Sequence, residues 1–179
     1  MEFKLPDGRV LEFIDYQMPL KAKQGDKGIG KVDLFGVIDH KVPAVIELKI
    51  DSANGGQADS PLRALLEGLA YCAIIEKNLA KITAEAFNKF NKKLNRELTL
   101  VVLAPDEYWR RYLQNRSAGD WLPEIKKISR ILKDELNIDI LLLAMSDSEF
   151  DMGLEGMPAK LTGNCDLVSV ETLALAVQQ

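Results

Sequence analysis

The sequence predicts a single α/β domain over residues 1–179, with a mixed central sheet, N-terminal antiparallel hairpins and flanking helices. Alternating, β-rich runs fill the first 50 residues, and helical periodicity dominates residues 61–136. Two nearly continuous apolar runs, 98–104 within that helical region and 138–145 after it, are typical of strands buried on both faces. We place the core at about residues 10–145, with a C-terminal extension over 146–179.

The N-terminal strands are marked by alternation and by turn residues. Val10–Tyr16 alternates after a Pro6-Asp7-Gly8 turn. The runs Lys31–Ile38 and Pro43–Ile50 flank a loop of about four residues, Asp39–Val42, and predict a β-hairpin. We expect residues 21–30, rich in Lys and Gly, to be mobile, and residues 51–60 to form a loop.

Helices then begin at Ser60-Pro61, an N-cap residue followed by proline at the first helical position. In the first helix, Pro61 to about Lys77, the 3.6-residue period predicts a core-facing stripe of Leu62, Leu66, Leu69 and Ala73. A second helix over about 81–95 would turn Ile82, Ala86, Phe90 and Leu94 inward, and Lys81, Glu85, Lys89, Lys92 and Lys93 outward. Further helices are expected at about 106–115 and 122–136, and a short strand at 165–170.

Composition excludes several classes of protein. The longest apolar run has seven residues, Leu69–Ile75, too short for a membrane span, and the N-terminus lacks the apolar region of a secretory signal. Cys72 and Cys165 stand far apart, without metal-ligand spacing, and predict reduced thiols in a cytoplasmic protein. The net charge is −4, yet residues 61–137 carry 14 basic and 10 acidic side chains. That excess indicates either solvated helix faces or an electrostatic footprint.

One group of charged residues in the predicted hairpin is a candidate catalytic site. If the hairpin folds about His40, Asp33 lies opposite Glu47, and Lys49 shares their face because the strand period is two. Two adjacent carboxylates under partial burial repel each other, and a hard divalent cation such as Mg²⁺ relieves that repulsion. The alternative is a plain amphipathic strand with Glu47 and Lys49 in water.

This arrangement resembles the PD-(D/E)XK nuclease superfamily, which has the restriction-endonuclease-like fold. The family pattern is an Asp on one strand, an (Asp/Glu)-x-Lys on the next, and then a helix and a further strand. The similarity covers about residues 30–104. It implies that Asp33, Glu47 and the main-chain carbonyl of Leu48 ligate Mg²⁺ or Mn²⁺. It also implies that Lys49 positions the attacking water and stabilises charge at the phosphate.

The helix that follows the hairpin adds further candidates. Arg63, Glu67 and Tyr71 are spaced four residues apart and share one helix stripe, so they would lie near the site or face the substrate. Glu67 stands where many relatives have Gln, at the Gln-x-x-x-Tyr element of the family. No N-terminal helix with a further acidic ligand is evident, and Glu12 is the candidate for that ligand.

Two functions follow, and they remain alternatives at this point. The first is a metal-dependent nuclease, with nucleic acid as its partner, DNA rather than RNA, no membrane partner, and a homodimer as one option for assembly. The second is a catalytically inactive protein of the same fold that binds nucleic acid or another protein.

Three other features have competing interpretations. His40 is expected to be a solvent-exposed turn residue rather than a catalytic base. Tyr108, Trp109 and Tyr112, next to two arginines, form either a helix that buries its aromatic rings or a base-stacking platform. The Lys-rich stretch over 81–96 is either a solvated face or a nucleic-acid contact.

Overall fold

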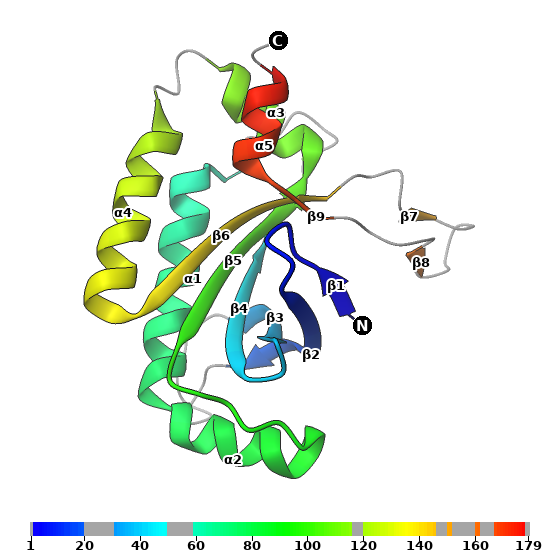
Figure 1. Ribbon diagram of the computed structural model, residues 1–179, viewed down its shortest axis with the longest axis vertical. Coiled ribbons are helices and arrows are strands. Elements are labelled where there is room, and N and C mark those ends of the chain that lie inside the picture. The colour runs from blue at the N-terminus through cyan, green and yellow to red at the C-terminus, as the bar shows by residue number, and fades with distance from the viewer. Residues whose placement is uncertain are drawn as a thin grey trace.

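The computed structural model of the chain (Figure 1) describes residues 2–19, 31–49, 59–115, 120–145, 150–151, 160–161 and 167–177. The expected mobile stretch 21–30, most of the expected loop 51–60 and Cys165 lie outside the described residues. Cys72 is a free, buried thiol. No helix in the described ranges is long and apolar enough to cross a membrane.

A mixed seven-stranded sheet forms the centre of the protein, which confirms the predicted α/β class with flanking helices. Its order is β1-β2-β3-β4-β5-β6-β9. The strands are β1 (Glu2–Lys4), β2 (Val10–Pro19), β3 (Lys31–Ile38), β4 (Val42–Leu48), β5 (Leu98–Pro105), β6 (Ile138–Met145) and β9 (Leu167–Ser169). The β4–β5 and β5–β6 pairs are parallel and the other neighbours are antiparallel. A separate pair joins β7 (Phe150–Asp151) to β8 (Lys160–Leu161).

The β3–β4 hairpin has the register that the sequence predicts. Phe35 pairs with Val45 and Val37 with Pro43, both symmetric about His40. The connection is a three-residue turn, 39–41, because β4 already begins at Val42. Asp39 and His40 take φ values of 48° and 61°, a left-handed conformation that Asp and His tolerate better than most residues. His40 is exposed, as expected.

Five helices flank the sheet in the described part of the chain: α1 (Pro61–Lys77), α2 (Leu79–Phe90), α3 (Asp106–Gln114), α4 (Trp121–Leu136) and α5 (Val170–Val177). Helices α1 and α4 lie side by side along the sheet, and α2 crosses at the end of the molecule where the β3–β4 turn lies (Figure 1). Helix α5 packs against α3. It was not expected from the sequence, because the glycines of the C-terminal extension suggested loops.

The buried face of α1 differs from the predicted stripe. Leu62 and Leu66 are 48% and 59% exposed, and Ala73 is also exposed. Gly68 lies so close to β5 that a Cβ atom on it would come within 2.4 Å of Leu100 Cδ1. A helix that approaches a sheet this closely must present a very small residue at the point of contact, so the face that carries Gly68 turns to the sheet. The buried residues of α1 are Pro61, Ala64, Leu65, Gly68, Cys72 and Ile75.

The second helix is shorter than predicted. It ends where Asn91 adopts a left-handed conformation, a common C-terminal cap. Phe90 is consequently 41% exposed rather than inward, whereas Leu94 is buried beyond the helix end. Lys92, predicted to point outward, contacts Glu12 on β2.

The aromatic cluster of α3 belongs to the core. Tyr108 and Trp109 are fully buried, and Trp109 Nε1 donates a hydrogen bond of 2.9 Å to the carbonyl of Leu143 on β6. Their rings meet edge to face, with centroids 5.0 Å apart. The base-stacking interpretation is therefore wrong for these two rings.

Candidate functional site

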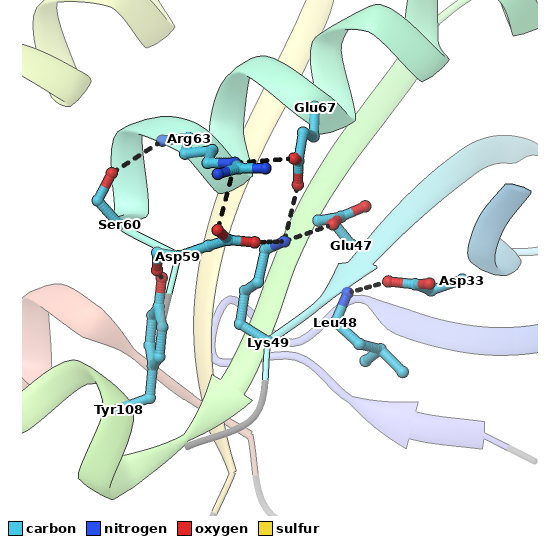
Figure 2. Close-up of polar contacts among 9 residues, drawn as sticks. All are labelled: Asp33, Glu47, Leu48, Lys49, Asp59, Ser60, Arg63, Glu67 and Tyr108. Atoms are coloured by element: carbon cyan, nitrogen blue, oxygen red, sulfur yellow. Dashed lines mark hydrogen bonds and ion pairs between the residues drawn. The ribbon is translucent and has the colours of Figure 1, made fainter. Parts of the chain in front are cut away.

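The candidate site lies where β4 ends and α1 begins (Figure 2). The β3–β4 ladder ends at the pair Leu34–Ile46, and Asp33 and Glu47 are the next residues beyond that pair on the two strands. The N–H of Lys49 donates to the carbonyl of Leu103 on β5, at 2.9 Å. The sheet therefore continues to hold the backbone just beyond the end of β4.

Lys49 is the centre of the site. Its Nζ lies 2.9 Å from Glu47 Oε1, 3.2 Å from Asp59 Oδ2 and 2.8 Å from Glu67 Oε2, so three carboxylates surround one ammonium group (Figure 2). The Lys49 side chain is only 11% exposed. The interpretation of Glu47 and Lys49 as solvated residues of an amphipathic strand is therefore wrong.

A second cation closes this cluster on the solvent side. Arg63 Nε lies 3.2 Å from Asp59 Oδ1 and 3.1 Å from Glu67 Oε1, and its side chain is 65% exposed. Asp59 and Glu67 therefore each bridge Lys49 and Arg63.

The segment before α1 is fixed from two sides. Ser60 caps the helix, because its Oγ accepts a hydrogen bond from the N–H of Arg63 at 3.3 Å. The hydroxyl of Tyr108, on α3, donates to the main-chain carbonyl of Asp59 at 2.7 Å. These two contacts hold Asp59 where its carboxylate reaches Lys49.

Asp33 contacts the backbone at the end of β4 rather than the cations. Its Oδ2 accepts a hydrogen bond of 2.9 Å from the N–H of Leu48, and its side chain is half-buried (Figure 2). This contact keeps the Asp33 carboxylate beside Leu48, the residue whose carbonyl the family resemblance assigns to a metal.

Glu47 has the most perturbed carboxyl group of the site. Its residue is 4% exposed, and Oε2 is buried without a hydrogen-bond partner. Burial raises the pKa of Glu47 from 4.5 to about 7, and the neighbouring charges of Asp33 and Glu67 also raise it. The hydrogen bond from Lys49 lowers this pKa but does not outweigh burial.

The remaining titratable groups respond to the same charges. Burial disfavours the ammonium form of Lys49, but its hydrogen bonds to Glu67 and Glu47 prevail, and its pKa is raised. The hydrogen bond from Lys49 lowers the pKa of Glu67. Burial, together with the charges of Glu47 and Glu67, raises the pKa of the Tyr71 hydroxyl. Tyr71 thus belongs to the same electrostatic environment.

The donor set fits a hard divalent cation. Three carboxylates contact two cationic side chains and the Asp33 carboxylate lies nearby, which leaves an excess of negative charge. The unpartnered Glu47 Oε2 is a buried oxygen that lacks any compensating contact among the described residues. Carboxylate and carbonyl oxygens are the ligands that Mg²⁺ and Mn²⁺ prefer.

Two members of the cluster were missed by the sequence analysis. Asp59 stands in a segment without hydrophobic periodicity, and Tyr108 is 49 residues further along the chain. Asp59 stands four residues before Arg63, and this i,i+4 spacing was the one available signal.

Glu12, in contrast, is not part of the site. It pairs with Val37, near the β3–β4 turn, and its carboxylate contacts Lys92 and His40. The hydrogen bond from Lys92 lowers its pKa. Ligand atoms of Glu2, Glu12 and His40 all lie within 4.8 Å of one another. Because Lys92 already neutralises Glu12, this cluster does not present the uncompensated charge found around Glu47.

Comparison with known proteins adds no relative: no family model matches the chain, and no curated protein or solved structure matches it either.

Proposed function

We propose that the protein is a metal-dependent nuclease of the PD-(D/E)XK type, hydrolysing phosphodiester bonds in nucleic acid, DNA rather than RNA. The observation that carries the proposal is the buried, half-unpartnered Glu47 carboxylate between Asp33 and Lys49 at the end of β4. A carboxylate is costly to bury without compensation, and function is a common reason for keeping one there.

The order of elements supports the same proposal. The β3–β4 hairpin carries Asp33 and Glu47, α1 follows, and β5 then runs parallel to β4. The family resemblance expects this succession, with the restriction-endonuclease-like fold as its implied architecture.

Asp33, Glu47 and the main-chain carbonyl of Leu48 are the groups that would hold Mg²⁺ or Mn²⁺. When bound there, the ion supplies charge neutralisation at the phosphate and acidifies a coordinated water. Glu47 suits this role because its Oε2 needs a positive partner that the described residues do not give it.

Lys49 would act on the phosphate. Its raised pKa keeps the ammonium group charged, so it donates hydrogen bonds and accepts none. In the proposed reaction, Lys49 exchanges one of its three carboxylate contacts for a phosphate oxygen or the attacking water, and so stabilises the developing charge. Asp59 and Glu67 hold its position until then, and the exposed Arg63 can reach a neighbouring phosphate.

Cleavage assays with labelled single-stranded and double-stranded DNA, and with RNA, test the proposal. We expect cleavage with Mg²⁺ or Mn²⁺ and none in EDTA. Lys49→Ala should abolish cleavage while Mn²⁺ binding, followed by calorimetry, stays largely intact. Lys126→Ala is the matched control, because it removes a lysine from an ion pair with Glu171, outside the site. Absence of cleavage with every substrate and either metal would refute the proposal.

The second candidate is a non-catalytic protein of the same fold. The observation that favours it is that all three carboxylates around Lys49 lie within 3.2 Å, so the ammonium is fully engaged. Binding of nucleic acid without cleavage, unchanged by Lys49→Ala, would select this alternative.

A further inference from the structure

The segment that runs through α2 to the start of β5 concentrates positive charge. Residues 77–96 contain six basic side chains and one acidic one, in a chain whose net charge is −4. Helix α4 offers a contrast within the same molecule, because residues 121–136 contain four basic and three acidic side chains. The excess of positive charge is therefore specific to α2 and the residues on either side of it, and is not shared by all the helices.

Five of the six cations are exposed and make no ion pair within the described part of the chain. We call them the basic surface: Lys77, Lys81, Lys89, Lys93 and Arg96. The sixth, Lys92, is bound to Glu12 and also contacts His40 at 3.1 Å. Unpaired cations concentrated in one short segment repel each other, and a polyanion relieves that repulsion.

The basic surface is anchored to the sheet. Lys92 joins β2 through Glu12, and the N–H of Asn95 donates to the carbonyl of Lys41 in the β3–β4 turn at 2.8 Å. Leu94, between them, is buried. Together with the packing of Ala86 against the core, these contacts fix where the lysines stand.

From this placement we propose that the basic surface binds the phosphate backbone of nucleic acid, as a site separate from the one that cleaves it. This inference rests on the proposed function for the identity of the polyanion. Nucleic-acid backbones are bound mainly by Lys and Arg contacts to phosphates, without sequence preference. The exposed rings of Phe87 and Phe90, at 55% and 41%, offer bases an apolar contact on the same helix.

An anionic membrane is the other polyanion to consider, and α2 fits it less well. A membrane-surface helix turns its apolar face outward into the lipid. In α2 the apolar side chains do not form one outward face, because Ala86 is buried and Ile82 packs against the core. Among its large apolar side chains, only the rings of Phe87 and Phe90 are exposed. Nucleic acid is thus the partner that the orientation of α2 favours.

The spacing between the two sites predicts a minimum length of substrate. Helix α1 begins at the candidate site and ends next to α2, and it has 17 residues. At about 1.5 Å per residue it spans roughly 25 Å, or about seven base pairs at about 3.4 Å each. A nucleic acid shorter than that cannot contact both sites.

Binding in EDTA tests the inference without cleavage. The test variant is Lys81→Gln/Lys89→Gln/Lys93→Gln, and the matched control is Lys127→Gln/Arg130→Gln/Lys133→Gln on α4, with the same change in charge. By fluorescence anisotropy with a 30-base-pair duplex, we expect the test variant to raise Kd about tenfold. We also expect it to reduce the slope of log Kd against log salt by about 2 to 3, at roughly 0.9 per lost phosphate contact. The control should change Kd less than twofold.

The outcomes separate the two proposals. If the protein binds DNA through α2 but never cleaves it, the basic surface stands and the nuclease proposal fails. If it cleaves DNA and the two triple variants bind alike, the nuclease proposal stands and the basic surface is refuted. No binding to nucleic acid, or α2-dependent binding only to vesicles of anionic lipid, would also overturn the inference.

Discussion

Glu47→Gln should stabilise the metal-free protein at neutral and alkaline pH, because glutamine mimics the protonated carboxyl at every pH. The pKa of Glu47 is raised from 4.5 to about 7 in the folded protein, chiefly by burial. Between these two values the folded state binds more protons than the unfolded chain, so the free energy of unfolding falls as pH rises. The contribution of Glu47 is complete below pH 4.5 and lost above pH 7.

The size of the effect follows from the same two values. At about 1.4 kcal/mol per pH unit, the interval from 4.5 to 7 corresponds to about 3 kcal/mol. At pH 8 the free energy of unfolding of the Glu47→Gln variant should exceed that of wild type by up to this amount, and at pH 4 the two values should be equal. For a protein of this length, that difference raises Tm by roughly 6–12 °C.

Thermal and urea unfolding in EDTA from pH 4 to pH 8 would measure this difference. Glu12→Gln is the control, because the hydrogen bond from Lys92 lowers the pKa of Glu12 and reverses the sign. The stabilisation from Glu12 is present above its ordinary pKa and lost as pH falls through the lowered value, so Glu12→Gln should destabilise the protein at pH 8. Parallel pH profiles for wild type and Glu47→Gln would refute the assignment of Glu47 as an uncompensated buried carboxyl.

Three further outcomes can be measured by thermal or urea unfolding. Millimolar Mn²⁺ should raise the wild-type Tm through mass action and leave Asp33→Ala nearly unmoved, whereas equal shifts in both would contradict a role for Asp33 as a ligand. Gly68→Ala should lower the free energy of unfolding by about 1–2 kcal/mol, although alanine favours helix, because its Cβ would overlap Leu100. In the double variant with Leu100→Ala the combined loss should be smaller than the sum of the two single losses, and a simple sum would exclude the clash. Ser60→Ala should cost about 1 kcal/mol through loss of the cap on α1, and an unchanged urea midpoint would contradict that contribution.

The sequence by itself determined the features that depend on local pattern. Alternation and a loop symmetric about His40 set the β3–β4 register, because a slip of one residue would turn every side chain to the other face of the sheet. Nearly continuous apolar runs identified β5, which is buried along almost its whole length, and β6, which is at least partly buried at every position, because both strands lie inside the sheet between two neighbours.

Sequence patterns were misleading about which face of a helix is buried and where a helix ends, because packing against neighbouring elements decided both. Leu62 and Leu66 have the periodicity of a buried stripe, yet the close approach of Gly68 to Leu100 selects the face of α1 that carries Gly68. The apolar spacing predicted a helix that continues past Asn91. In the structure, the left-handed conformation of Asn91 ends α2, and Lys92 contacts Glu12. These choices depend on the shape of the neighbouring element, which no local window of sequence contains.

In the candidate site, too, some contacts follow from local sequence spacing and others only from tertiary packing. Sequence spacing was enough to group Glu47 with Lys49, and Arg63 with Glu67, because strand and helix periods fix which neighbours share a face. Only the tertiary structure brought Asp59 and Tyr108 to them, and only it showed that Glu47 is buried with one oxygen unpartnered. Burial depends on what covers a side chain, and here the cover comes from α1, more than ten residues beyond the end of β4.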